Sequence, residues 1–190
     1  MEFLSETHQL LVLERNLWDE GFSFVAGVDE AGRGPLAGPV VAAAAVFARG
    51  AKIPPVNDSK KLTGKQRDEL REALLATEGF IFEVVEIQPE EIDRINILRA
   101  THAAMREAVS RLAKADFALI DGLPVQNFPV PSRAVVKGDS KSASIAAASI
   151  MAKTHRDKIM DELAVRWPAY GFDSHKGYGT AEHLEALRKH

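Results

Sequence analysis

Apolar residues recur along this chain in two patterns, one typical of strands and the other typical of helices. Short, nearly continuous apolar runs bounded by glycine, proline or acidic residues favour buried strands. They predict strands over residues 22–28, 40–48, 80–87, 115–120 and 134–136. Apolar residues spaced three and four apart, together with capping residues, predict helices over residues 6–19 and from Thr63, Pro89, Asn96, Ser142 and Ala181. The alternation of the two kinds of element indicates an α/β protein.

Residues at the expected helix starts support these assignments. Thr63, with Gln66 three positions later, is suited to a capping box, and Pro89 is suited to a first helical turn. The stretch from Ser142 is rich in alanine and serine, and such small side chains allow a helix to lie close against a sheet. Thr180 is the expected cap of the last helix.

Length, charge and cysteine content narrow the class of protein. A chain of 190 residues is expected to form one domain, 1–190, with an N-terminal helix in residues 1–20 and a C-terminal loop and helix in residues 165–190. The absence of cysteine excludes disulfides and thiolate metal ligands. With no signal peptide and no long apolar run, a cytoplasmic protein without membrane contact is expected. A net charge of −3 argues against binding nucleic acid through charge alone, so any such site must be local.

Acidic residues come where predicted strands end. Asp29 and Glu30 close the first strand and precede a glycine-rich turn. Asp121 follows the fourth strand, and Asp139 comes soon after the fifth. Ligands of α/β sheets bind at such strand ends, but four carboxylates brought together there would repel one another. Divalent cations remove that conflict. Oxygen ligands favour Mg²⁺ or Mn²⁺, and two such ions roughly 3.5–4 Å apart can activate a water and stabilise a leaving oxygen.

Each of these acids also has an ordinary structural explanation. An Asp-Glu pair before a Gly-Pro turn is common at protein surfaces, and so is the Asp121-Gly122 turn. Asp139 is suited to cap the helix that follows it. His102 falls on the apolar stripe of its helix and is expected in the core rather than at a metal.

One longer motif adds to this picture. Residues 27–40, Gly-Val-Asp-Glu-Ala-Gly-Arg-Gly-Pro-Leu-Ala-Gly-Pro-Val, closely resemble the signature of bacterial type 2 ribonuclease H, ribonuclease HII. The resemblance continues at later points and covers nearly the whole chain. It implies a ribonuclease H-like fold, in which a mixed five-stranded sheet is flanked by helices on both faces and followed by a helical C-terminal part. The first three strands are expected to be antiparallel neighbours, and the expected order β-β-α-β-α-β-α-β-α fits this fold.

The resemblance also implies a reaction. It implies an endonuclease that cleaves the RNA strand of RNA/DNA hybrids and cuts DNA duplexes that contain ribonucleotides. The expected products have 5′-phosphate and 3′-hydroxyl ends. The enzyme is expected to be a monomer. The active complex is expected to contain two Mg²⁺ or Mn²⁺ ions. The expected catalytic and metal-binding residues are Asp29, Glu30, Asp121 and Asp139.

Contacts with nucleic acid follow from the same resemblance. The Gly-Arg-Gly turn is expected to face the 2′-hydroxyl that distinguishes RNA from DNA, with the tyrosine stacked near the same sugar. The Asp-Ser-Lys segment is expected beside the substrate backbone, although a solvated loop also explains its lysine. Simple loop packing also explains the tyrosine. The residues expected to bind nucleic acid are Gly32, Arg33, Gly34, Ser59, Lys60 and Tyr178.

Two other classes of function stay open at this level. Another metal-dependent nuclease of the ribonuclease H-like group would keep the four acids but not the Gly-Arg-Gly turn. A non-catalytic nucleic-acid-binding module would account for the basic residues and the glycines, but it has no use for four acids.

Overall fold

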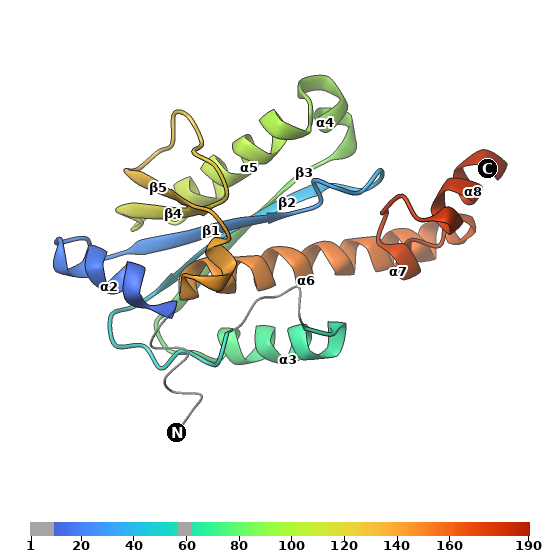
Figure 1. The fold of residues 1–190 in the computed structure, drawn as a ribbon. Helices are drawn as coiled ribbons and strands as arrows, with labels where there is room; N and C mark the ends of the chain where they lie inside the picture. Colours follow the sequence, from blue (N-terminus) through green and yellow to red (C-terminus); the bar gives the residue numbers. More distant parts are fainter. Residues whose placement is uncertain (1–9, 57–61) are drawn as a thin grey trace.

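The computed structural model describes residues 10–56 and 62–190 (Figure 1). Five strands form one sheet in the order β3-β2-β1-β4-β5. β1 pairs antiparallel with β2, and β2 with β3, whereas β1 with β4 and β4 with β5 are parallel. The predicted mixed sheet with three antiparallel first strands is confirmed. The strands are β1 (Val25–Ala31), β2 (Val40–Phe47), β3 (Phe80–Ile87), β4 (Phe117–Asp121) and β5 (Ser132–Val135).

Two details of the predicted strands are wrong. β1 does not stop before the acids but continues through them, because Asp29 and Glu30 pair with small residues of β2, Ala43 and Ala42. The expected order also placed a helix between the fourth and fifth strands, and the described residues have none there. Three prolines over residues 122–131 account for this, because proline interrupts helical hydrogen bonding.

Five helices begin where the sequence predicts. Thr63 and Gln66 form the expected capping box, the Asn96 side chain accepts the Arg99 N–H, and Thr180 caps the last helix. Ser142 caps the longest helix by accepting the N–H of Ile145. The helices are α2 (Val12–Asp19), α3 (Gly64–Leu75), α4 (Pro89–Ile95), α5 (Ile97–Arg111), α6 (Ala143–Arg166), α7 (Phe172–His175) and α8 (Ala181–Lys189), with short 3₁₀ helices η2 (Gly138–Ser140) and η3 (Pro168–Tyr170). The helix expected over residues 6–19 differs, because α2 begins only at Val12 and residues 1–9 lie outside the described chain.

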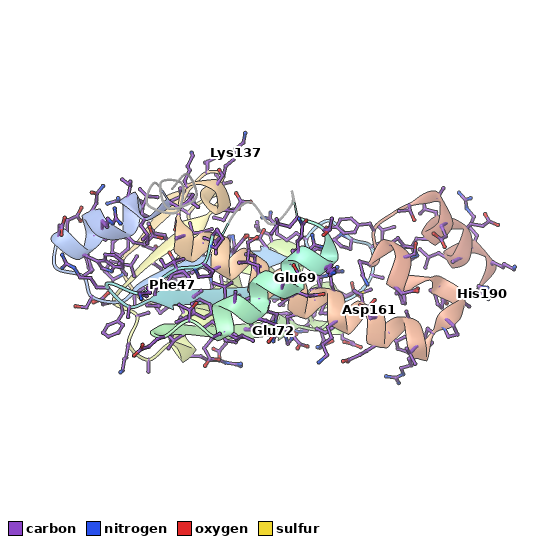
Figure 2. The ribbon with its side chains drawn as sticks, turned by 90° about the horizontal axis from the view of Figure 1, so that it is seen from below. Phe47, Glu69, Glu72, Lys137, Asp161 and His190 are labelled. Atoms are coloured by element: carbon purple, nitrogen blue, oxygen red, sulfur yellow. The ribbon has the colours of Figure 1, made fainter. Side chains whose placement is uncertain are left out.

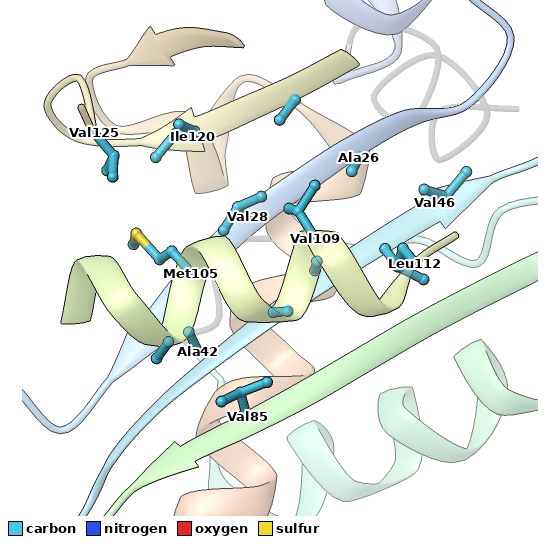
Figure 3. Close-up of a cluster of buried hydrophobic side chains, with 14 residues drawn as sticks. Ala26, Val28, Ala42, Val46, Val85, Met105, Val109, Leu112, Ile120 and Val125 are labelled. Carbon is cyan, nitrogen blue, oxygen red and sulfur yellow. The ribbon is translucent and has the colours of Figure 1, made fainter. Parts of the chain in front are cut away.

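The core lies on both faces of the sheet. β2 is buried along its whole length, and its residues alternate between the two faces as a strand requires. Ala42, Ala44 and Val46 pack on the side of α5, together with Met105 and Val109 of that helix (Figure 3). Val41, Ala43, Ala45 and Phe47 pack on the side of α6, with α3 beyond it. Helices therefore cover both faces, as predicted.

The start of α6 lies directly on β1. A Cβ atom placed on Gly27 would lie 2.0 Å from the carbonyl carbon of Ser144, so only glycine permits this approach. From there α6 runs along the sheet, and α7 and α8 lie at its far end (Figure 1). The view from below shows α3, with Glu69 and Glu72, in front of α6, and Asp161 and His190 toward the C-terminal end (Figure 2). None of the helices over residues 10–56 and 62–190 is long and apolar enough to cross a membrane.

Candidate active site

Asp29 and Asp121 lie beside each other on two parallel strands. β1 and β4 pair with Val28 opposite Ile120, and the acid is the next residue in each strand. Val28 and Ile120 face α5, so the alternation of a strand turns both acids toward the side of α6. Asp29 is only 4% exposed, whereas Asp121 is half-buried. Parallel pairing thus brings together two acids that are far apart in the sequence.

The negative charge of Asp29 is unfavourable in this position. Burial raises the pKa of Asp29 well above its ordinary value, and the charges of Glu30 and Asp121 raise it further. Two hydrogen bonds act in the opposite direction. The Glu30 N–H donates to Asp29 Oδ1 over 2.7 Å, and the Ser149 hydroxyl donates to the same carboxylate. A buried carboxylate whose pKa is raised by like charges is typical of a functional site.

Glu30 makes an ion pair with the basic residue of the glycine-rich turn. Arg33 Nη1 lies 3.0 Å from Glu30 Oε1. The charge of Arg33 also reaches α5: partial burial lowers the pKa of His102, and the charges of Arg106 and Arg33 lower it further. His102 is half-buried, so its predicted place in the core is wrong.

Asp121 is tied to the segment that carries Asp139. The Gly138 N–H donates to Asp121 Oδ1 over 2.6 Å. A Cβ atom on Gly138 would lie 2.5 Å from Ile145 Cδ1 and 3.2 Å from Asp121 Oδ1, so the close approach depends on glycine. Asp139 is the next residue, buried within η2. Since Ser142 caps α6, the alternative in which Asp139 is that cap is wrong.

The acids lie near one another, but their side chains do not form a complete metal-coordination site. Over the described ranges, no three acidic, histidine or cysteine side chains are close enough to hold one metal ion. The hydrogen bonds explain this, because Glu30 is directed at Arg33 and Asp121 is directed at the Gly138 N–H.

The glycine-rich turn lies against the C-terminal segment. Gly32 has a φ of +103°, and a Cβ atom there would lie 2.5 Å from the Pro39 carbonyl oxygen. A Cβ atom on Gly34 would lie 3.4 Å from Tyr178 Cε1, and the Leu36 N–H donates to the Gly177 carbonyl over 2.8 Å. The structure therefore brings together the turn and the tyrosine that the sequence predicts for one sugar.

Arg156 of α6 joins these two segments from within the protein. It is 1% exposed, and it donates to three main-chain carbonyls: Nε to Pro39 at 3.0 Å, Nη2 to Ala37 at 2.9 Å and Nη1 to Lys176 at 3.0 Å. Burial lowers the pKa of this guanidinium. Its planar fork is suited to several fixed acceptors, and a lysine ammonium could not reach all three in this geometry.

Comparison with known proteins identifies the family. The family model described as Ribonuclease HII matches residues 26–190, which include all four acids, the glycine-rich turn and the C-terminal segment. The chain belongs to the ribonuclease HII family. Enzymes of this family are ribonucleases H, which are hydrolytic endonucleases, and this excludes the alternative of a non-catalytic binding module.

Individual relatives agree with this assignment. The ribonuclease HII of Chlamydia caviae is 54% identical over 187 residues, which cover 98% of this chain and 86% of that protein. The ribonuclease H2 of Pyrococcus horikoshii superposes with a TM-score of 0.74 at 29% identity, over 87% of this chain and 86% of that one. The ribonuclease HII in a complex with PCNA from Archaeoglobus fulgidus gives 0.71 at 28% identity, covering 87% of both chains.

Three residues that support the candidate site were not singled out from the sequence. Ser149 and Arg156 belong to α6, and Arg156 falls on its buried stripe between Ala152 and Met160, a polar interruption that could have revealed it. Glu14 interrupts the apolar face of α2 in the same way. Its Oε1 accepts from the Ser142 hydroxyl at 2.6 Å and from the Ser144 N–H at 2.9 Å, and so holds the start of α6.

Two predicted contacts cannot be compared with the structure. Ser59 and Lys60 lie outside the described residues, and their contact with the substrate backbone stays a prediction.

Proposed function

We propose that this member of the ribonuclease HII family hydrolyses the RNA strand of RNA/DNA hybrids and incises on the 5′ side of ribonucleotides embedded in duplex DNA. The products are a 5′-phosphate and a 3′-hydroxyl. One observation carries the proposal: the acids on β1 and β4 share a neighbourhood, and the turn that follows β1 lies against Tyr178. A site for phosphodiester cleavage thus adjoins a main-chain surface suited to reading a sugar.

We further propose that the site takes two Mg²⁺ or Mn²⁺ ions, held by Asp29, Glu30, Asp121 and Asp139. The donor set fits, because all four groups are oxygen ligands and the pKa of Asp29 is raised by burial and by Glu30 and Asp121. The positive charge of a bound ion would offset both the burial of Asp29 and the repulsion from Glu30 and Asp121. Bound ions would supply activation of the attacking water and stabilisation of the leaving oxygen.

The protein's own groups orient these acids. Ser149 and the Glu30 N–H fix the Asp29 carboxylate, and the Gly138 N–H fixes one oxygen of Asp121. Because the Gly138 N–H binds Oδ1 of Asp121, Oδ2 of the same carboxylate can bind an ion. If Glu30 held an ion, its carboxylate would give up the contact with Arg33, and the guanidinium would then be available to contact a phosphate.

Recognition of RNA is assigned to the main chain of Gly32, Arg33 and Gly34 together with Tyr178. Main-chain groups next to glycine can approach a 2′-hydroxyl closely, and that group donates and accepts hydrogen bonds. Tyr178 is 45% exposed, so its side chain is accessible to a sugar. Ser59 and Lys60 are assigned to the substrate backbone. We take the enzyme to act in the cytoplasm as a monomer.

The test is a cleavage assay with Mg²⁺ on four duplexes of one sequence: DNA, RNA, RNA/DNA hybrid, and DNA with a single ribonucleotide. Cleavage of the last two alone, with incision 5′ of the ribonucleotide, is expected. Equal cleavage of the all-DNA duplex would contradict recognition of the 2′-hydroxyl.

A further inference from the structure

Two buried imidazoles lie behind Tyr178. His175 of α7 is 7% exposed and His183 of α8 is fully buried. Their rings stack with centroids 4.4 Å apart at an angle of 18°, and the Phe172 ring lies nearly perpendicular to both, at 79° to His175 and 78° to His183. The pair belongs to neither the acidic site nor the sheet core.

The hydrogen bonds of His175 define its tautomer. Nε2 lies 2.7 Å from the Tyr170 carbonyl oxygen, which can only accept, so this nitrogen carries the proton. Nδ1 accepts the Gly177 N–H over 3.2 Å. The ring therefore connects α7 to the main chain immediately before Tyr178.

His183 holds the same segment through the next residue. Its Nδ1 lies 3.0 Å from the Tyr178 carbonyl oxygen and must donate to it. Its Nε2 is buried and has no hydrogen-bond partner in the part of the chain that the structure describes. A buried nitrogen without a partner is unfavourable, and an apolar side chain would fill the space without that cost. The imidazole donates a hydrogen bond to the Tyr178 carbonyl, which an apolar side chain in this position could not do.

The two rings therefore fix the main chain around an exposed tyrosine. Gly177 and Tyr178 are bound by one imidazole each, and the Tyr178 N–H also donates to the His175 carbonyl at 2.9 Å. On the opposite side, Gly177 accepts the Leu36 N–H. The Tyr178 side chain is half exposed, so its place beside Gly34 depends on this main chain.

We propose that His175 and His183 are positioning residues that hold Tyr178 against the Gly32–Gly34 turn and thereby set the preference for an isolated ribonucleotide in DNA. The inference rests on the proposed sugar-reading role of Tyr178. A single ribonucleotide offers one productive register, and that register needs the ring in place. A long hybrid offers many registers and tolerates a displaced ring.

The test compares variants that keep or remove one donor. His183→Asn keeps an N–H near the position of Nδ1, whereas His183→Leu has a similar size and lacks it. The quantity measured is the ratio of kcat/KM on DNA with one ribonucleotide to kcat/KM on a hybrid. His183→Leu should lower this ratio about 3- to 10-fold, the range expected for one hydrogen bond, and His183→Asn should stay within about twofold of wild type. His183→Phe, which keeps a flat ring, repeats the comparison if the leucine variant does not fold.

A double-variant cycle separates positioning from general damage. In a Tyr178→Ala background, His183→Leu should leave the ratio unchanged, because the residue through which it acts is gone. The positioning role of His183 is refuted if His183→Leu lowers the ratio equally in both backgrounds. It is also refuted if His183→Leu leaves the ratio of the wild type unchanged while Tyr178→Ala lowers it. In either case the sugar-reading role of Tyr178 stands. If Tyr178→Ala itself leaves the ratio unchanged, sugar reading fails, and the positioning role fails with it.

Direct observation of the ring gives a second readout. The chain has two tyrosines, so 3-fluorotyrosine labelling gives two ¹⁹F signals, and Tyr170→Phe assigns them. His183→Leu should shift the Tyr178 signal, whereas His183→Asn should leave it near the wild-type position. A Tyr178 signal that His183→Leu leaves unmoved would overturn the proposal.

Discussion

Asp29 lies beside Asp121 across the parallel strands β1 and β4, so two carboxylates meet where one of them is almost completely buried. Among the residues that the structure describes, the Ser149 hydroxyl and the Glu30 N–H act to stabilise the charged form of Asp29, against burial and two like charges. The site is thus organised for positive charge rather than for the stability of the free protein.

The first prediction concerns that stability. In chelator at neutral pH, Asp29→Asn should unfold at a higher temperature than the wild type, because the amide keeps the hydrogen-bond acceptor and removes a buried charge. Each kcal/mol gained raises Tm by about 2–4 °C in a chain of this size. Exposed Asp93→Asn is the control and should change Tm little.

The pH dependence of this difference has a definite sign. The pKa of Asp29 is raised in the folded protein, so protonation of Asp29 stabilises the fold. This stabilisation is fully present below the pKa of the unfolded chain, about 4, and is lost as pH rises through the pKa of the folded protein. The Tm advantage of Asp29→Asn should therefore shrink as pH falls toward 4. A variant less stable than wild type at neutral pH would show that Asp29 is not electrostatically strained.

The second prediction tests the contact between α6 and β1. Gly27→Ala places a Cβ atom 2.0 Å from the Ser144 carbonyl carbon, which forces the helix away from the strand. Overpacking of this kind costs about 1–3 kcal/mol or more, so thermal unfolding should show Tm lowered by several degrees. Gly64→Ala is the matched control, since no atom of residues 10–56 or 62–190 lies within 4 Å of its added Cβ. Equal Tm values for the two variants would refute the close approach.

The third prediction is metal dependence. Cleavage of a hybrid should cease in excess chelator and return when Mg²⁺ or Mn²⁺ is added in excess of the chelator, because the donors are oxygen ligands. Far-ultraviolet circular dichroism in chelator should stay that of the folded protein, which separates loss of ions from loss of fold. Undiminished cleavage in chelator would exclude the proposed use of the four acids.

The fourth prediction separates the two parts of the Tyr178 side chain. Tyr178→Phe keeps the flat ring and should retain most activity if stacking dominates. Tyr178→Ala should lose cleavage at a single ribonucleotide in DNA, and lose less on a long hybrid, when both kcat/KM values are measured. If Tyr178→Ala cleaved both duplexes at the wild-type rate, Tyr178 would have no role in reading the sugar and would serve only to pack the loop.

Much of this arrangement was predictable because it is local. Caps such as Thr63 and Asn96 act within one turn, and apolar runs identify strands whatever their partners, so β3 and the starts of α3, α4, α5, α6 and α8 were predicted correctly. The short helix α7 was not predicted, since its residues were expected to form a loop. The end of β1 was not, because its last residues are held by pairing with Ala42 and Ala43 of another strand.

The supporting residues of the site could not be derived from local pattern. Ser149 meets Asp29, and Arg156 meets Ala37, only once α6 has docked on the sheet. The hydrophobic pattern records that a polar residue interrupts a buried stripe, but it does not record which distant carbonyl or carboxylate that residue will meet.

The most direct test of the central claim is Asp121→Asn, measured for binding and for cleavage of the same hybrid in Mg²⁺. The change removes one proposed ligand charge and preserves shape, so hybrid affinity should remain within a few-fold of wild type. Cleavage should fall by at least roughly a thousandfold, since metal activation contributes several kcal/mol to lowering the barrier. Cleavage at the wild-type rate by a folded Asp121→Asn variant would show that the carboxylate beside Asp29 takes no part in the reaction.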